Sequence, residues 1–142
     1  MAETAQVTNL TQNPFDSWKS IVISLYMTLV GYGVLVGIPV ISTAWVTLLG
    51  FSEVEVGRVA GADLGGLSVG AVITAALIAK TSRRMLALIG LFIAVIANWF
   101  CISIVDYETV LWLRALSGVG SGIFTAVAVS SLGASSKPAL AY

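Results

Sequence analysis

The sequence contains no histidine and only one cysteine, Cys101, among its 142 residues. These absences exclude an intramolecular disulfide, zinc sites built from cysteine and histidine, haem held by histidine, and a histidine general base. We expect neither a metal nor any other cofactor. Cys101 lies within an apolar run, where a cysteine is most simply a small apolar residue. Because the apolar segments also lack Ser/His, His/Asp and paired carboxylates, the sequence does not predict an enzyme.

Charged residues are scarce as well. They make up 10% of the chain, with seven Lys and Arg against seven Asp and Glu. No basic face is available to bind a phosphate backbone, so nucleic acid is not an expected partner. Hydrophobic residues make up 58% of the chain, and the mean hydropathy is +0.98. This composition predicts an integral membrane protein with the lipid bilayer as its solvent.

Four apolar segments each reach the roughly 20 helical residues that a bilayer core requires. We therefore predict an all-α membrane fold with a transmembrane region at 18–133, whose four helices span residues 18–49, 57–79, 85–105 and 110–132. Segment 1–17 is polar and lacks the features of a cleavable signal, so the first helix is expected to be retained. Residues 134–142 are expected to lead towards a fifth helix, which would make the chain an N-terminal fragment.

The first segment is longer than one bilayer crossing and contains Pro39, which predicts a tilt or a bend. Proline has no backbone N–H, so the carbonyl of Leu35 loses its usual helical donor. In lipid, such a carbonyl is tolerated only where neighbouring protein covers it. We therefore expect the first helix to be packed against other helices rather than isolated.

The charges separate by side of the membrane if the four helices alternate in direction. One side then receives Lys19, Lys80, Arg83, Arg84 and Lys137. The other receives Glu53, Glu55, Asp106 and Glu108, with Arg58 as its only basic residue near a helix end. The positive-inside rule predicts that segment 1–17, segment 134–142 and hence both ends of the chain are cytoplasmic. We expect the membrane to be a bacterial inner (plasma) membrane.

Two ionisable residues fall inside the spans, Asp63 in the second and Arg114 in the fourth. Each is costly at depth unless it is paired or reaches water. At about 1.5 Å per residue, both lie about 6 to 10 Å inside the same boundary, so a direct or water-bridged pair is geometrically allowed. The alternatives are that Arg114 snorkels to the interface and that Asp63 is stabilised by its helix N-terminus. Both residues are candidates for substrate contact or proton coupling.

Other polar and aromatic residues in the spans are weaker candidates. Tyr32 and Asn98 are included among the substrate or coupling residues, although such side chains more often make hydrogen bonds between helices. Trp18, Trp45 and Trp112 lie near span ends and are expected to be interfacial anchors. Small residues recur at helical spacing in two stretches and predict close helix packing. The second and fourth spans carry them: Gly57, Gly61, Gly65, Gly66, Gly70, Ser117, Gly118, Gly120, Ser121 and Gly122.

Three local features resemble the N-terminal part of a major facilitator superfamily transporter. The first is the turn from Leu48 to Gly57 after a long first span. The second is the loop from Ala75 to Arg84, whose Lys80, Arg83 and Arg84 match the basic positions of the family loop motif, while Ala75, Ala79 and Ser82 replace its usual glycine, aspartate and glycine. The third is Arg114 followed by Gly118 and Gly120, with Ser117 in place of a frequent glutamine.

The resemblance implies a secondary active transporter of a small solute, with these four helices forming part of a six-helix half of the bundle. Its expected partners are the lipid bilayer, a small-molecule substrate and the remaining helices of the parent transporter. The main alternative is a four-helix structural or assembly subunit of a larger membrane complex. A small multidrug exporter is disfavoured because the first span lacks an intramembrane glutamate.

Overall fold

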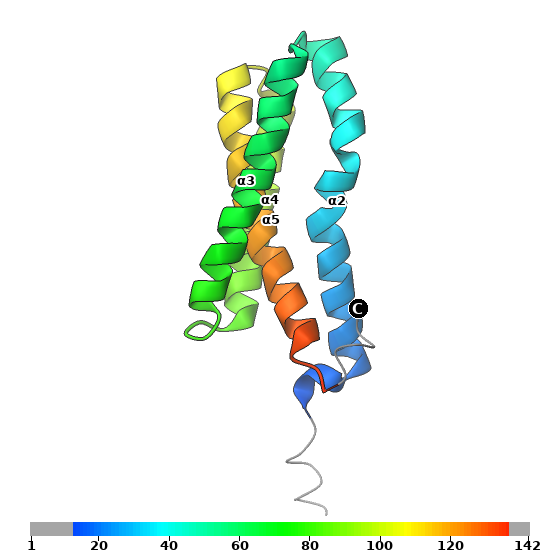
Figure 1. Ribbon diagram of the computed structural model, residues 1–142, viewed down its shortest axis with the longest axis vertical. Helices are drawn as coiled ribbons and strands as arrows, with labels where there is room; N and C mark the ends of the chain where they lie inside the picture. The colour runs from blue at the N-terminus through cyan, green and yellow to red at the C-terminus, as the bar shows by residue number, and fades with distance from the viewer. Residues whose placement is uncertain (1–12, 137–142) are drawn as a thin grey trace, which may run out of the picture.

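Four long helices and one short 3₁₀ helix make up the secondary structure of the computed structural model, which describes residues 13–136. Their order is η1 (Pro14–Asp16), α2 (Trp18–Leu49), α3 (Glu53–Leu77), α4 (Arg83–Ser103) and α5 (Tyr107–Gly133) (Figure 1). All four long helices are apolar and long enough to cross a bilayer, which confirms the all-α membrane fold. The predictions for residues 1–12 and 137–142, which include Lys137 and most of the lead towards a fifth helix, lie outside the described residues.

Polar caps set the helix ends, and they extend α3 and α5 beyond the apolar runs. The Ser52 hydroxyl accepts from the backbone N–H of Glu55 at 3.3 Å, and the Glu55 carboxylate accepts from the backbone N–H of Ser52 at 2.8 Å. This capping box starts α3 at residue 53 rather than 57. Asp106 caps α5, and hydrogen bonds from the side chain and backbone of Thr109 hold the pKa of Asp106 below its ordinary value. The cap is therefore charged at neutral pH.

Helix α5 is the central helix of the unit, and α2, α3 and α4 all pack against it (Figure 1). In its most apolar 18-residue stretch, 61% of the residues are buried, against 12 to 28% in the other three helices. Many of its buried positions carry small residues, which let neighbouring backbones approach closely. They include Ser117, Gly118, Gly120, Ser121 and Gly122.

The closest backbone approach is between α3 and α5, along what we term the glycine seam. It consists of Gly66 and Gly70 on α3 with Gly118 and Gly122 on α5. A Cβ atom at any of these four positions would collide with a backbone carbonyl oxygen of the opposite helix. The seam therefore needs glycine for space, not for backbone flexibility. Its two pairs share a four-residue spacing, which places each pair on one helix face.

Some of the other glycines form a second close contact between helices, and others lie on an uncovered face of α3. Gly120 faces α4, where an added Cβ would lie 2.6 Å from the Gly90 carbonyl oxygen and 2.6 Å from the Ala94 nitrogen. Three glycines of α3 have no atom within 4 Å of an added Cβ, so only part of the small-residue pattern of this helix marks a contact. They are Gly57, Gly61 and Gly65.

Helix α2 is the least covered of the four. It approaches α5 closely at Gly31, where an added Cβ would collide with the Thr125 hydroxyl. Around Pro39 the helix is open, with Val36 80% and Val40 75% exposed. The expectation that protein covers this region is therefore not met by the described residues. The physical reason is that α2 packs mainly on α5 and leaves its other faces free.

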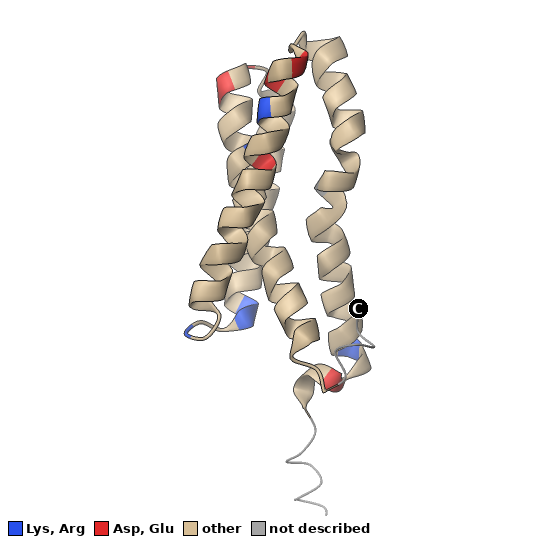
Figure 2. Cartoon of the chain, in the orientation of Figure 1, with Lys and Arg blue, Asp and Glu red and all other residues tan. Residues whose placement is uncertain are grey.

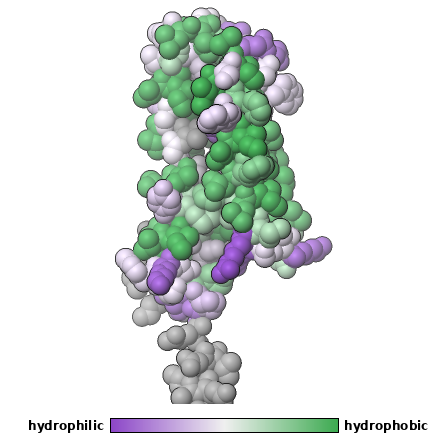
Figure 3. All heavy atoms as spheres, turned by 180° about the vertical axis from the view of Figure 1, so that it is seen from behind, coloured by the Kyte–Doolittle hydropathy of each residue, from purple (hydrophilic) through white to green (hydrophobic). Residues whose placement is uncertain are grey.

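Most charged residues lie near the two ends of the helix bundle (Figure 2), and mostly apolar side chains cover the surface between the ends on the face drawn in Figure 3. We call one end the basic end, because it carries Lys19, Lys80, Arg83 and Arg84, and the other the acidic end, because it carries Glu53, Glu55, Asp106 and Glu108. At the basic end, residues just before α2 form hydrogen bonds with residues just after α5. The Asn13 amide donates to the Ala134 carbonyl at 2.7 Å, and Asp16 accepts from the Ser136 backbone N–H at 2.7 Å and from its hydroxyl.

Candidate functional site

An ion pair inside the apolar region joins α3 to α5. Arg114 Nη2 lies 2.8 Å from Asp63 Oδ2, and the two residues are 3% and 6% exposed. At about 1.5 Å per residue, Asp63 lies about 15 Å and Arg114 about 10 Å from the starts of their helices, deeper than the sequence boundaries indicated. Snorkelling of Arg114 is therefore wrong for this structure. The pair is direct, and each charge neutralises the other in a region that disfavours isolated charges.

Asn98 extends the ion pair to α4. Its Oδ1 accepts from Arg114 Nη1 at 2.8 Å, while its Nδ2 donates to Ser117 Oγ at 2.6 Å and to the Ala94 carbonyl at 2.8 Å. We call Asp63, Arg114, Asn98 and Ser117 the polar network. It connects three helices through charge-assisted and neutral hydrogen bonds, and Ser117 occupies the position where the family often has glutamine. The Ser117 hydroxyl accepts one of the two hydrogen bonds that the Asn98 amide donates.

Helix α2 reaches the polar network through Trp45. The guanidinium carbon of Arg114 lies 6.0 Å from the centroid of the Trp45 ring, within the range of a cation–π contact. Trp45 also packs on a buried apolar cluster at the acidic end, formed by Phe51, Val56, Val59 and Val110. It is therefore not simply an interfacial anchor, in contrast to Trp18 and Trp112, which are 77% and 71% exposed. Arg114 Nε is buried without a hydrogen-bond partner among the described residues.

Tyr32 does not join this network. Its residue is 41% exposed and lines a separate cavity of about 400 Å³ with Gly122 and Thr125 of α5. Those two residues follow Arg114 by 8 and 11 positions, which corresponds to about 12 to 16 Å along the helix axis. The structure thus brings together three of the four candidate residues for substrate or coupling and leaves Tyr32 apart.

The basic loop residues lie at the basic end, far along the helices from the polar network. Arg83 donates through Nη1 to the Ser130 carbonyl and to Ser131 Oγ, both at 3.4 Å. Its guanidinium carbon lies 4.5 Å from the centroid of the Phe15 ring. Arg83 therefore ties the start of α4 to η1 and to the end of α5. Arg84 and Lys80 are exposed.

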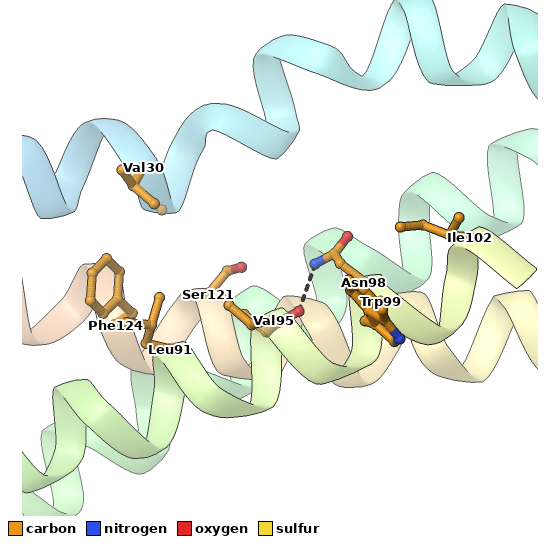
Figure 4. A pocket seen from close by; sticks show the side chains of 10 residues that line it. Val30, Leu91, Val95, Asn98, Trp99, Ile102, Ser121 and Phe124 are labelled. Atoms are coloured by element: carbon orange, nitrogen blue, oxygen red, sulfur yellow. Dashed lines mark hydrogen bonds between the residues drawn. The ribbon is translucent and has the colours of Figure 1, made fainter.

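A cavity of about 330 Å³ adjoins Asn98 between α2, α4 and α5 (Figure 4). Asn98 and Ser121 are its only polar lining side chains among the described residues, and the others are apolar or glycine. Figure 4 shows Val30 on one side facing Leu91, Val95 and Phe124 on the other. Such a lining suits an apolar neighbour better than a hydroxyl-rich solute. Among the described residues, no three metal-ligating side chains of His, Cys, Asp or Glu lie together.

A comparison with protein-family models decides the family. The model described as sugar (and other) transporter matches residues 4–142, nearly the whole chain. The chain belongs to this family. The resemblance to major facilitator superfamily transporters is therefore confirmed, and this transporter-family chain is an integral membrane protein whose described residues, 13–136, form four transmembrane helices. Searches of curated proteins and of solved structures found no match. The family match does not favour the structural-subunit alternative.

Asn98→Leu is expected to lower the free energy of unfolding of this transporter-family chain by about 1 to 2 kcal/mol, because Arg114 Nη1 then loses its acceptor in a dry environment. Unfolding in mixed detergent micelles, followed by circular dichroism, would measure the change. Ser117→Ala is the matched variant, since it removes only the acceptor for the Asn98 amide and should cost about 0.6 kcal/mol. An effect of Asn98→Leu no larger than that of Ser117→Ala would contradict a supporting contact to Arg114.

Proposed function

We propose that this chain takes part in the secondary active transport of a small solute, and that the Asp63–Arg114 pair couples transport to protons. The family match supports transport as the activity. The observation that carries the coupling is the buried ion pair itself, because both groups are held by helices that pack against each other. Sugars are the first substrates to test, since the family description names them.

The geometry favours a coupling role for Arg114 over direct contact with an anionic substrate. Two of its nitrogens already bond to Asp63 and Asn98, so its charge is compensated within the protein. A proton added to Asp63 would cancel the carboxylate charge and leave the buried guanidinium without its counter-ion. That state is costly unless α3 and α5 shift or water reaches Arg114. Protonation of Asp63 and a movement of α3 relative to α5 would thus be linked through the Asp63–Arg114 pair.

We also propose that further membrane helices complete the transporter. The support comes from α2, where Pro39 removes the donor for the Leu35 carbonyl and the surrounding Val36 and Val40 are exposed. Such a site in lipid needs a covering helix. In transporters of this superfamily the solute binds between two helical halves near the midplane.

The orientation belongs to the same proposal. Lys19, Lys80, Arg83 and Arg84 share one end of the bundle, and the positive-inside rule favours a cytoplasmic location for that end. Both termini of the chain would then be cytoplasmic. The bacterial inner membrane stays a prediction.

The proposal is tested by uptake of radiolabelled monosaccharides into liposomes that contain the full-length protein and are exposed to an inward proton gradient. Asp63→Asn keeps the shape of the side chain but cannot carry the proton, so accumulation of sugar should fall at least tenfold. Exchange of labelled for unlabelled sugar without a gradient should persist, because it needs no net proton movement. Arg114→Ala should reduce both processes, since it leaves Asp63 charged and unpaired.

Glu53→Gln is the matched control, because it removes an exposed carboxylate from the same helix. It should leave accumulation and exchange unchanged. If Asp63→Asn accumulates sugar as the unmodified protein does, Asp63 has no part in coupling. If the unmodified protein accumulates none of the sugars tested, the substrate class is wrong.

A further inference from the structure

A cavity of about 670 Å³ opens at the basic end between η1, α2, α4 and α5. Three cations line it, and they come from two different helices. They are Lys19 of α2 with Arg83 and Arg84 of α4. None of the described residues that line the cavity is acidic. The nearby Asp16 is not among the lining residues, and its carboxylate accepts hydrogen bonds from the backbone N–H and the hydroxyl of Ser136. The positive charge of this cavity is therefore not compensated by its own walls.

The N-termini of α2 and α4 add to the positive potential of this cavity. The first turns of α2 and α4 contain no acidic residue, although helix N-termini favour negative charge there. Ser17 and Ser82 cap these two helices and also line the cavity. Three cations and two helix N-termini thus lie at one site. Their positive charges repel one another, and a bound anion would offset this repulsion.

Further along α2 the lining of the cavity becomes mostly apolar. Ile23 and Met27 of α2, Ala87 of α4 and Val127 of α5 line this part, together with the polar Ser24 of α2. The lining residues of α2 extend from Ser17 to Met27, about 15 Å along the helix axis. A free phosphate would use only the cationic mouth of such a cavity. A molecule with a phosphate and an attached hydrocarbon chain would use both parts.

We propose that this cavity binds an anionic membrane phospholipid, with its phosphate between Lys19, Arg83 and Arg84 and the start of an acyl chain along Ile23 and Met27. Arg83 is held on the Phe15 ring and bonded to α5, so the lipid would complete a contact that joins η1, α2, α4 and α5. This site lies at the opposite end of the bundle from the ion pair and does not depend on the proposed coupling.

The test is binding of phosphatidylglycerol to the delipidated full-length protein in detergent, counted by native mass spectrometry. Lys19→Gln with Arg84→Gln should raise the apparent Kd at least about tenfold, because two of the three cations near the phosphate are lost. The matched control is Lys80→Gln with Arg58→Gln, which removes one lysine and one arginine outside the cavity and should change Kd less than about twofold. Equal losses in the two double variants would overturn the site.

Three further measurements decide the ligand and guard against misfolding. Lys19→Arg with Arg84→Lys should bind within about twofold of the unmodified protein, and a loss as large as that of the glutamine variant would overturn charge as the cause. Phosphatidylcholine should bind more weakly, because its headgroup carries its own cation; equal binding would overturn recognition of the phosphate charge. Glycerol 1-phosphate should displace little lipid. If it competes as well as phosphatidylglycerol does, the site takes a free phosphate and the lipid proposal is wrong.

Discussion

Asp63→Ala is expected to lower the free energy of unfolding by about 3 to 5 kcal/mol, the cost of leaving one partner of a buried ion pair uncompensated. Arg114 is 3% exposed, and its other acceptor, Asn98, carries no charge. The guanidinium would therefore keep its charge in a dry region without a counter-ion. Unfolding in mixed detergent micelles, followed by circular dichroism, measures the change.

The double variant Asp63→Leu with Arg114→Met tests whether the loss of stability comes from an unpaired charge or from the loss of the ion pair itself. It removes both charges and fills a similar volume with apolar atoms, so it should be more stable than Asp63→Ala alone. Arg58→Ala serves as the control, because Arg58 is an exposed cation on the same helix as Asp63. An effect of Asp63→Ala as small as that of Arg58→Ala would show that Arg114 does not depend on Asp63.

The second large effect is expected at the glycine seam, where two adjacent glycines should behave in opposite ways. Gly66→Leu should destabilise the chain by at least about 3 kcal/mol, because a Cβ at this position already collides with the Ala115 carbonyl oxygen and lies 3.0 Å from the Val119 nitrogen. Neither backbone atom can move without separating α3 from α5. The loss of that contact would also disturb the nearby Asp63–Arg114 pair.

Gly65→Leu is the matched control for this prediction. An added Cβ at Gly65 has no atom within 4 Å, so the new side chain extends towards lipid. Since leucine is a better helix former than glycine, the variant should be neutral or stabilised by up to about 1 kcal/mol. The same unfolding experiment compares the two. Equal destabilisation at residues 65 and 66 would mean that helix α3 is rotated relative to α5 from the orientation described here.

The Asp63–Arg114 pair shows how far reasoning from the sequence reached into the site. Because both residues interrupt apolar segments near the same side of the membrane, their similar depth could be estimated from helix rise alone. The role of Asn98 as an acceptor for Arg114 was not predicted, nor were the contacts of Ser117 and Trp45 with this network. A polar amide in a span indicates a hydrogen bond but not its partner. Tyr32 carried the same kind of signal and lies elsewhere.

The glycines of α3 also show that a sequence pattern does not identify the partner of a residue. Gly57, Gly61 and Gly65 have the four-residue spacing of a packing face, yet no backbone lies against them within the described residues. Gly66 and Gly70 have the same spacing one residue later and form the seam with α5. Spacing identifies a face of small residues on a helix. It does not identify which of two neighbouring faces another helix occupies.

The sequence by itself determined the absence of histidine chemistry, the insertion into the membrane, the four helices and the separation of basic from acidic ends. These properties follow from the total hydropathy and charge of segments of about 20 residues, so they do not depend on how the helices are rotated. The tertiary structure alone decided that α5 is central, that Gly66 rather than Gly65 meets it, and that Arg114 bonds to Asp63 and Asn98. Each residue along a helix turns the side chain by about 100°, so partner choice depends on a rotation that only packing between helices sets.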